Sequence, residues 1–360
     1  FGGIEKFVEQ VSYGTSKHQI HNEFIAISKS SIEKEIYIKN LKVHLCKENL
    51  SFASTPFSLS EIKKIKKIIN NFDIVHYHFP YPFSDLLNII TRNKKKYIIT
   101  YHSDIVKQKY LLKFYNPLMK YHLKRAKKII TTSPNYLESS KILMDYKDKV
   151  EVIPCGIDEG VLENYSSILV DNYKNKYGEK FFFFVGRHVY YKGLKYLVEA
   201  SRGCNYPIVI AGSGVLTKDL KNLAKKYNLK NVHFIGNISD EEKYSLLKAC
   251  YAFVFPSHLR SEAFGLSLLE GSMFGKPLIS CEIGSGTTFI NKHMHTGIVI
   301  KPANKDDLLN AMEYLWKNEN IARELGENAK DRYQNIFNLD VMSKGYADVY
   351  KNIFKSNSVF

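Results

Sequence analysis

The stretch FFFFVGRHVYYKG at residues 181–193 opens a repeating pattern that fills the second half of the chain. An apolar run ends at a glycine, and a polar segment of helical length then leads to the next apolar run. The later runs are PIVIAGSG (207–214), NVHFIG (231–236), AFVFP (252–256), PLISC (277–281) and GIVI (297–300). Apolar runs that alternate with helical segments are typical of βα units and a parallel sheet.

The first half repeats this pattern. Apolar runs rich in β-branched and aromatic residues predict strands at residues 23–28, 73–78, 97–101, 128–132 and 150–154. Helices are expected between them, for example at 59–70 and at 111–126, where Pro117 predicts a kink or a break. The polar stretch from 159 to 179 is interpreted as a linker.

A chain of 360 residues is long for one α/β core, and a prior of about 150 residues per domain suggests two domains. We therefore predict an α/β fold of two Rossmann-like, doubly wound domains. The first covers residues 1–160 and the second residues 161–360, with the last helix returning to the first domain.

Composition excludes some classes of protein and leaves others open. The hydrophobic share of 44% and the charged share of 24% are ordinary for a globular protein, and no apolar stretch approaches the roughly 18 residues that span a bilayer. The net charge of +16 favours anionic partners such as nucleic acid, an acidic membrane surface or a phosphorylated substrate, although a solvated lysine-rich surface would give the same number. The five cysteines are scattered without metal-ligand spacing, so we expect reduced thiols and no metal site.

Residues that directly follow the strands are the first candidates for binding, because ligands of open α/β sheets lie beyond the carboxyl ends of the strands. Arg187 follows the first strand of the second half, and Lys192 lies five residues later. A guanidinium fork and an ammonium group are both suited to a diphosphate. Two solvated surface cations remain the alternative.

A second candidate group lies in SEAFGLSLLEGSMFG at residues 261–275. The spacing predicts a helix that begins near Gly265 and ends at Gly275, with Glu262 ahead of it and Glu270 in its early turns. The free N–H groups of that helix end form an anion site. Because carboxylates repel phosphate, we expect the two glutamates to accept hydrogen bonds from hydroxyls. Helix-terminal and solvated charges are the alternative interpretation.

Two weaker candidates come from the first half. Gly2 and Gly3 form a glycine-rich turn ahead of a helix, which lets backbone N–H groups approach phosphate. His102 directly follows the strand at 97–101 and faces the expected cleft, although a structural histidine is the commoner outcome. Thr217 stands where a dinucleotide fingerprint would have its third glycine, which argues against a dehydrogenase.

The order and spacing of these motifs resemble the retaining glycosyltransferases of the GT-B fold, family 4, over nearly the whole chain. The motifs are GGIE (2–5), YHSD (101–104), VEVIPCGID (150–158), FFVGRHVYYKG (183–193), IAGSG (210–214) and FPSHLRSEAFGLSLLEGSMFGKPLIS (255–280). Glu262 and Glu270, with seven residues between them, match the E-x7-E signature of that family. Family members have a strand just before GGIE, so we expect a first strand that is missing here.

The resemblance implies an inter-domain cleft and a role for each candidate. Arg187 and Lys192 would bind the donor diphosphate, Glu262 the transferred sugar, and Glu270 the ribose. Backbone amides of Gly265 and Leu266 would meet the phosphate and sugar, and Gly2 and Gly3 would close on the phosphate from the first domain. His102 would lie near the sugar and the acceptor. The family needs no metal, and the chain has no DxD triplet.

The resemblance also guides the expected reaction and partners. The donor phosphate would deprotonate the acceptor on the same face, with a carboxylate nucleophile as the alternative. The loop GSGTTFINKHMHTG (284–297) resembles that of bacterial transferases that add mannose or rhamnose during polysaccharide assembly. We expect GDP-mannose as the donor, a UDP-sugar as its alternative, no cofactor, and a saccharide or lipid-linked saccharide acceptor. We place the enzyme in the cytoplasm, at the inner face of the cytoplasmic membrane, where basic segments 59–70 and 109–128 would meet anionic lipid.

Two other classes of protein compete with this interpretation. A basic nucleic-acid-binding protein without enzymatic activity would explain the charge, but the chain has no recognisable nucleic-acid module, so we expect no nucleic-acid partner. An enzyme of the same fold with another reaction, such as a nucleotide-sugar epimerase or a glycoside phosphorylase, would be distinguished by its products.

Overall fold

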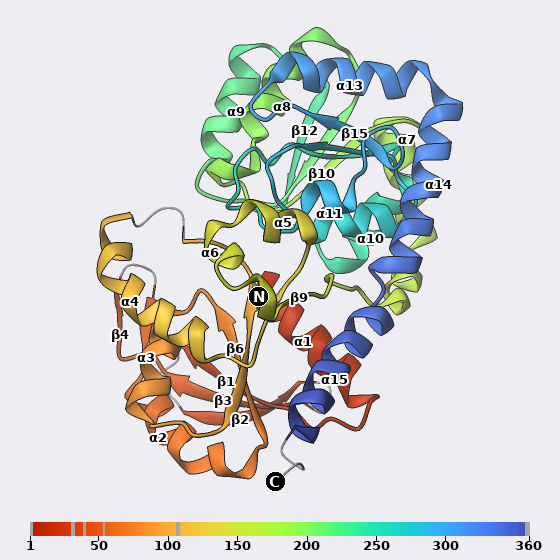
Figure 1. The fold of residues 1–360 in the computed structure, drawn as a ribbon. Coiled ribbons are helices and arrows are strands. Elements are labelled where there is room, and N and C mark those ends of the chain that lie inside the picture. Colours follow the sequence, from red (N-terminus) through yellow and green to blue (C-terminus); the bar gives the residue numbers. More distant parts are fainter. Residues whose placement is uncertain (1–2, 30–32, 39–40, 53–54, 106–108, 357–360) are drawn as a thin grey trace. The chain divides into compact units, whose positions relative to one another are not determined.

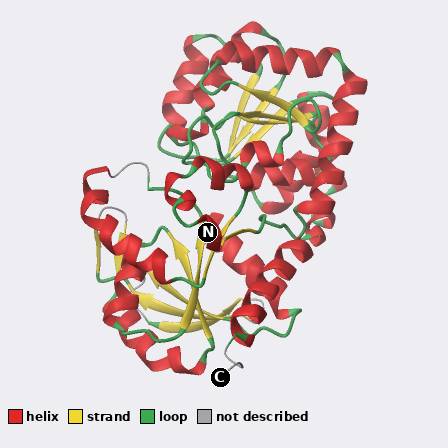
Figure 2. Cartoon of the chain, in the orientation of Figure 1, coloured by secondary structure: helices red, strands yellow, loops and turns green. Residues whose placement is uncertain are grey.

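The computed structural model describes the chain except for residues 1–2, 30–32, 39–40, 53–54, 106–108 and 357–360. Two compact units are present. Unit 1 consists of Phe1–Gly156 together with Leu339–Phe360, and unit 2 consists of Ile157–Asn338. In both units helices lie on the two sides of the strands (Figure 2).

Unit 2 is built on a six-stranded sheet with the strand order β12-β11-β10-β13-β14-β15, and every pairing is parallel. The strands are β10 (Phe182–Val185), β11 (Ile208–Ala211), β12 (Val232–Gly236), β13 (Ala252–Phe255), β14 (Leu278–Cys281) and β15 (Gly297–Ile300). The chain runs outward from β10 to β12 and then returns to start again at β13. The sheet is therefore doubly wound, as predicted, and its switch point lies between β10 and β13.

Helices cover both faces of this sheet (Figure 1). They are α7 (Ser167–Tyr177), α8 (Leu194–Ala200), α9 (Thr217–Lys226), α10 (Asp240–Ala249), α11 (Leu266–Met273), α12 (Thr287–Ile290), α13 (Lys305–Lys317) and α14 (Glu319–Ile336). Alternate strand residues supply the two cores. Phe182 and Phe184 pack with α8, α9 and α13 in one cluster, whereas the buried rings of Phe183 and Phe253 contact each other on the other face. The expected linker at 159–179 is wrong, because most of it forms α7.

The strands of unit 1 form separate sheets in the part of the chain that the structure describes. One is parallel, in the order β6 (Ile74–Phe79), β7 (Lys96–Tyr101), β8 (Lys128–Thr131), β9 (Val150–Val152). The second has β3 (Leu41–Lys47) between β1 (Glu23–Ser28), which is parallel to it, and β2 (Lys34–Ile38), which is antiparallel. The strands β4 (Leu50–Phe52) and β5 (Thr55–Phe57) pair antiparallel with each other. The strands from β2 to β5 were not predicted.

The helices of unit 1 are α1 (Gly3–Ser16), α2 (Leu59–Ile68), α3 (Pro82–Ile90), α4 (Lys109–Arg125), α5 (Pro134–Ser139), α6 (Lys141–Met144) and α15 (Leu339–Lys355). Helix α4 runs as one element through Pro117, so the expected break is absent. Helices α1 and α15 lie side by side (Figure 1), and they are so close that a Cβ on Gly14 would be 2.4 Å from the Cβ of Ser343.

Helix α15 is also bound to the β6–β7 sheet by buried polar groups. The Tyr350 hydroxyl shares a 2.7 Å hydrogen bond with His76 Nδ1, and the Tyr346 hydroxyl shares a 2.9 Å hydrogen bond with Thr100. Because buried polar groups are costly unless paired, these bonds fix the position of α15 on unit 1.

Candidate functional site

The loop after β10 carries the predicted diphosphate cations. Arg187 is exposed, and its guanidinium donates to the Tyr191 hydroxyl at 3.4 Å. Lys192 closes the 3₁₀ turn Tyr190–Lys192, and its side chain is only 11% exposed. The Lys192 ammonium lies 4.6 Å from the centre of the Phe255 ring, at the end of β13. The two cations therefore lie at the switch point of the sheet.

Glu262, in the loop after β13, pairs directly with Lys192. The Lys192 Nζ–Glu262 Oε2 distance is 2.5 Å, and the carboxylate side chain is 12% exposed. Ser257 Oγ donates to the same oxygen at 3.1 Å. The sequence indicated separate partners for the lysine and the glutamate, but the structure joins them in one shielded ion pair.

The loops that carry Lys192 and Glu262 are held together by their backbones. The His258 N–H donates to the Tyr191 carbonyl at 3.0 Å. Gly193 adopts φ +69°, and a Cβ at this position would lie 1.9 Å from the Pro256 carbonyl oxygen. Only glycine permits both this left-handed conformation and this close approach.

Helix α11 begins beside these loops, as predicted. Gly265 is its N-cap with φ +97°, and Leu266 is its first residue. Because glycine has no side chain to accept a hydrogen bond, the first N–H groups of α11 are available for an anion. The two strands that flank the switch point are thus followed by the loop of Arg187 and Lys192, the loop of Glu262 and the N-terminus of α11.

Glu270 lies in the second turn of α11 and is buried. Its Oε1 is 2.8 Å from Nζ of Lys243, a buried residue of α10. Burial opposes the charge of Lys243, but Glu270, Tyr244 and Asp240 together outweigh it and raise the pKa of the lysine. Lys243 is not among the site residues predicted from the sequence. A signal was present, because Leu246 and Leu247 lie one helical turn further on the same buried face.

His102 directly follows β7 in unit 1, where its N–H donates to the Phe79 carbonyl at 2.9 Å. Its Nε2 shares a 2.9 Å hydrogen bond with Nδ1 of His78, and the Phe7 ring contacts it edge-on with centroids 5.0 Å apart. Burial and His78 lower the pKa of His102 well below its ordinary value. Both histidines are therefore neutral at physiological pH. Gly3 begins α1, whereas Gly2 lies outside the described residues.

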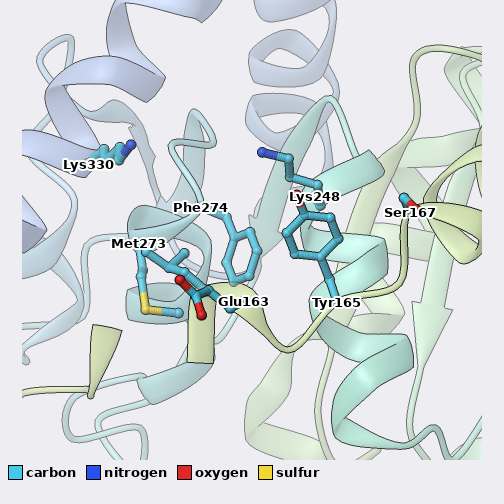
Figure 3. Close-up of a pocket in the computed structure, with 8 residues that line it drawn as sticks. Glu163, Tyr165, Ser167, Lys248, Met273, Phe274 and Lys330 are labelled. Atoms are coloured by element: carbon cyan, nitrogen blue, oxygen red, sulfur yellow. The ribbon is translucent and has the colours of Figure 1, made fainter. Parts of the chain in front are cut away.

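A separate pocket of roughly 500 Å³ opens among α7, α10, α11 and α14 of unit 2 (Figure 3). The rings of Tyr165 and Phe274 line it, and the ammonium of Lys248 lies 5.4 Å from the centre of the Tyr165 ring. None of the predicted site residues lines this pocket. Among the described residues, no group of His, Cys, Asp or Glu is arranged to hold a metal ion.

A doubly wound sheet with cations and a helix N-terminus at its switch point is typical of nucleotide-binding enzymes. Comparison with known families is more specific. The model of "Glycosyltransferase Family 4" matches residues 1–160, and that of "Glycosyl transferases group 1" matches residues 169–332.

O-antigen chain mannosyltransferase C of Escherichia coli is 41% identical over 358 residues, which are 99% of this chain and 96% of that protein. D-rhamnosyltransferase WbpZ of Pseudomonas aeruginosa is 43% identical over 336 residues, which are 93% and 88% of the two chains. The chain therefore belongs to the glycosyltransferases of family 4, and the enzyme class expected from its motifs is confirmed.

Solved structures agree on the fold. Sucrose-phosphate synthase from Thermosynechococcus elongatus matches with a TM-score of 0.82 at 21% identity, over 99% of this chain and 94% of that one. HepE of Anabaena, in complex with UDP and glucose, matches with a TM-score of 0.78 at 15% identity, over 97% and 96%. The GT-B fold predicted from the sequence is confirmed.

Proposed function

We propose that this glycosyltransferase binds a nucleotide sugar at the switch point of unit 2 and transfers the sugar with retention of configuration. The observation that carries the proposal is the shielded pair of Lys192 and Glu262 beside the N-terminus of α11. Arg187, Lys192 and the backbone amides of Gly265 and Leu266 would stabilise the diphosphate.

Charge stabilisation at this point would drive the reaction. As the bond between the sugar C1 and the phosphate oxygen breaks, the diphosphate leaves with the electron pair and gains negative charge. Arg187, Lys192 and the dipole of α11 are arranged to stabilise that charge. The acceptor hydroxyl attacks C1 from the same face and gives its proton to the departing phosphate.

Glu262 is suited to a sugar hydroxyl, because Lys192 and Ser257 hold its carboxylate in place. A catalytic part is also proposed for His102, with Gly2 and Gly3 approaching the phosphate. The neutral imidazole of His102 would hydrogen-bond the sugar and the acceptor without adding charge. We propose that no metal or cofactor takes part, since two cations and a helix end already supply positive charge.

Relatives support a role in surface polysaccharide synthesis, because the names of two of them refer to an O-antigen mannosyltransferase and a D-rhamnosyltransferase. We propose GDP-mannose as the donor, with a saccharide or lipid-linked saccharide as the acceptor. A UDP-sugar is the alternative, since HepE was solved with UDP and glucose. A thermal-shift screen of both donors would decide, because a donor at 100 times its Kd stabilises the protein by about 2.7 kcal/mol.

Steady-state kinetics of four variants test the site. Arg187→Ala and Lys192→Ala should each lose most activity while the fold stays intact. Glu262→Gln should mainly lower kcat, because a contact to the sugar must follow the distorted transition state. Glu270→Gln should mainly raise the donor KM, because the ribose does not change during the reaction. Wild-type rates for both cation variants would exclude this diphosphate site, and the opposite kcat and KM pattern would exclude the two glutamate roles.

We further propose that unit 1 binds an anionic membrane surface peripherally. None of the described helices is long and apolar enough to cross a bilayer. Helix α4 presents Phe114, which is 86% exposed, among the exposed Lys113, Lys120 and Lys124, while Met119 and Leu123 pack inward. An exposed aromatic ring flanked by lysines is suited to a membrane interface.

Cosedimentation with vesicles tests this surface. The wild type should bind anionic vesicles more strongly than neutral ones at low salt, because each lysine near an anionic leaflet contributes about 1 kcal/mol. Replacing Lys113, Lys120, Lys124 and Lys127 with Gln should remove the difference, and Phe114→Ala should weaken binding. Equal recovery of the wild type with both kinds of vesicle would contradict the proposal.

A further inference from the structure

Lys243 is a buried cation in a helix whose other lysine is exposed. Its side chain is 11% exposed, and its ammonium lies 2.8 Å from Glu270 Oε1 and 2.9 Å from Asp240 Oδ1. The side chain of Asp240 is 75% exposed, whereas that of Glu270 is only 7% exposed. A lysine that paired with Asp240 alone could stay in water, so the buried partner is the one that accounts for its inward position.

Stability alone is a poor explanation for this pair. A buried ion pair usually adds little to folding compared with apolar residues of the same volume, because both charges lose their hydration. What the pair does supply is a fixed geometry. Lys243 holds one carboxylate oxygen of Glu270 at 2.8 Å, so the carboxylate has one orientation.

The pair of Lys243 and Glu270 lies close to the proposed nucleotide site. Glu270 lies one turn into α11, whose N-terminus is at the switch point. Lys243 approaches from α10 and is not part of the loops that carry Lys192 and Glu262. A carboxylate whose orientation is fixed by a lysine of another helix accepts hydroxyl hydrogen bonds without first having to be ordered.

We propose that Lys243 is a positioning residue for the nucleoside of the donor, which orients the Glu270 carboxylate to accept the ribose hydroxyls. This inference rests on the proposed role of Glu270. Lys243 touches no reacting atom, so it governs donor affinity and the preference for ribose over deoxyribose, and leaves the rate of the chemical step unchanged.

Calorimetric titration with GDP and with 2′-deoxy-GDP tests the proposal, with the UDP pair used instead if UDP stabilises the wild type more. Lys243→Met should weaken binding of the ribonucleotide about tenfold, the size expected for losing one well-oriented hydrogen bond to a charged group. Binding of the deoxynucleotide should weaken less, and kcat at saturating donor should stay within about twofold of the wild type. Lys243→Arg, which keeps the charge and the donors, should restore most of the preference.

Matched variants separate positioning from a general loss of structure. Lys248→Met, which removes an exposed lysine from the same helix, should bind both nucleotides like the wild type. Lys243→Met combined with Glu270→Gln should bind no more weakly than Glu270→Gln alone, since Lys243 acts through that carboxylate. If Lys243→Met does not fold, Lys243→Gln carries the same comparison, because it keeps one N–H donor and removes the charge.

The outcomes distinguish the positioning role of Lys243 from the ribose role of Glu270. If Glu270→Gln weakens ribonucleotide binding and Lys243→Met does not, the positioning role is excluded and the proposed site stands. If Glu270→Gln changes neither the affinity nor the ribose preference, the ribose role of Glu270 is wrong and the positioning role falls with it.

Discussion

The sharpest stability test concerns Gly193, which closes the loop of Lys192. It has φ +69° and ψ 14°, and a Cβ there would lie 1.9 Å from the carbonyl oxygen and 2.9 Å from the carbonyl carbon of Pro256. Because both clashing atoms belong to the backbone, no rotation of a side chain relieves the contact. Gly236 offers a matched control, since it has φ +76° and a Cβ there would meet nothing within 4 Å.

The two substitutions share one cost and differ in another. A left-handed conformation costs a non-glycine residue about 1–2 kcal/mol, and the stiffer unfolded chain returns about 0.4–1 kcal/mol. Gly236→Ala should therefore lower the free energy of unfolding by about 1 kcal/mol. Gly193→Ala adds the overpacking against Pro256, about 1–3 kcal/mol, for a total of about 2–4 kcal/mol.

Urea unfolding followed by tryptophan fluorescence measures this difference. The chain has a single tryptophan, and Trp316 packs against Tyr206 and Phe182 in the core of unit 2, so its signal reports the unit that carries both glycines. With a slope of about 2 kcal/mol per molar urea, the midpoint should fall by about 1–2 M for Gly193→Ala and by about 0.5 M for Gly236→Ala. Equal midpoints for the two variants would refute the steric argument.

Three further predictions follow from buried charges and from the proposed chemistry. Burial raises the pKa of Glu61 to about 7, so the folded state binds more protons than the unfolded state, and stability falls as pH rises from about 4.5 to about 7. Glu61→Gln should therefore raise the melting temperature at pH 8 and not at pH 5. A difference in melting temperature that is independent of pH would contradict this prediction. Lys276 donates from the loop after α11 to the carbonyls of Lys248 and Cys250 at the end of α10. Lys276→Met should therefore lower the free energy of unfolding by about 1–3 kcal/mol in the tryptophan assay. Lys248→Met, which removes an exposed side chain, should leave the free energy of unfolding unchanged. Sugar transfer should continue in EDTA, and activity that is lost there and restored by magnesium or manganese would show that a metal is required.

Strands buried on both faces could be predicted from the sequence, because they appear as unbroken apolar runs. Strand β3 was missed for the opposite reason. Its sequence LKVHLCK alternates apolar residues with Lys42 and His44, which is the pattern of a half-buried strand and not an unbroken apolar run. His44 is nevertheless buried, because its Nε2 lies 2.6 Å from Glu23 Oε2 on β1. Helix α7 was missed because Tyr177 is its only buried residue, which leaves no apolar stripe to recognise.

The candidate site also has a part that the sequence predicts and a part that it does not. Arg187, Lys192, Glu262 and Gly265 could be chosen because each occupies a fixed position after a strand, and topology alone then gathers them at the switch point. Direct contacts between side chains could not be predicted from the sequence. Lys243 is one of 52 basic residues, and only the packing of α10 against the sheet turns this one toward a buried carboxylate.

The position of α15 in the chain has a consequence for synthesis. Unit 1 combines Phe1–Gly156 with Leu339–Phe360, so α15 leaves the ribosome after all of unit 2. Until α15 emerges, Thr100 and His76 lack their partners on that helix, and Gly14 lacks its close neighbour Ser343. Unit 2 is continuous and can fold first, since domains generally fold as units during translation. The part of the nascent chain that is made first is therefore the last to be completed, and a ribosome that stalls before residue 339 releases a finished unit 2 attached to an unfinished unit 1.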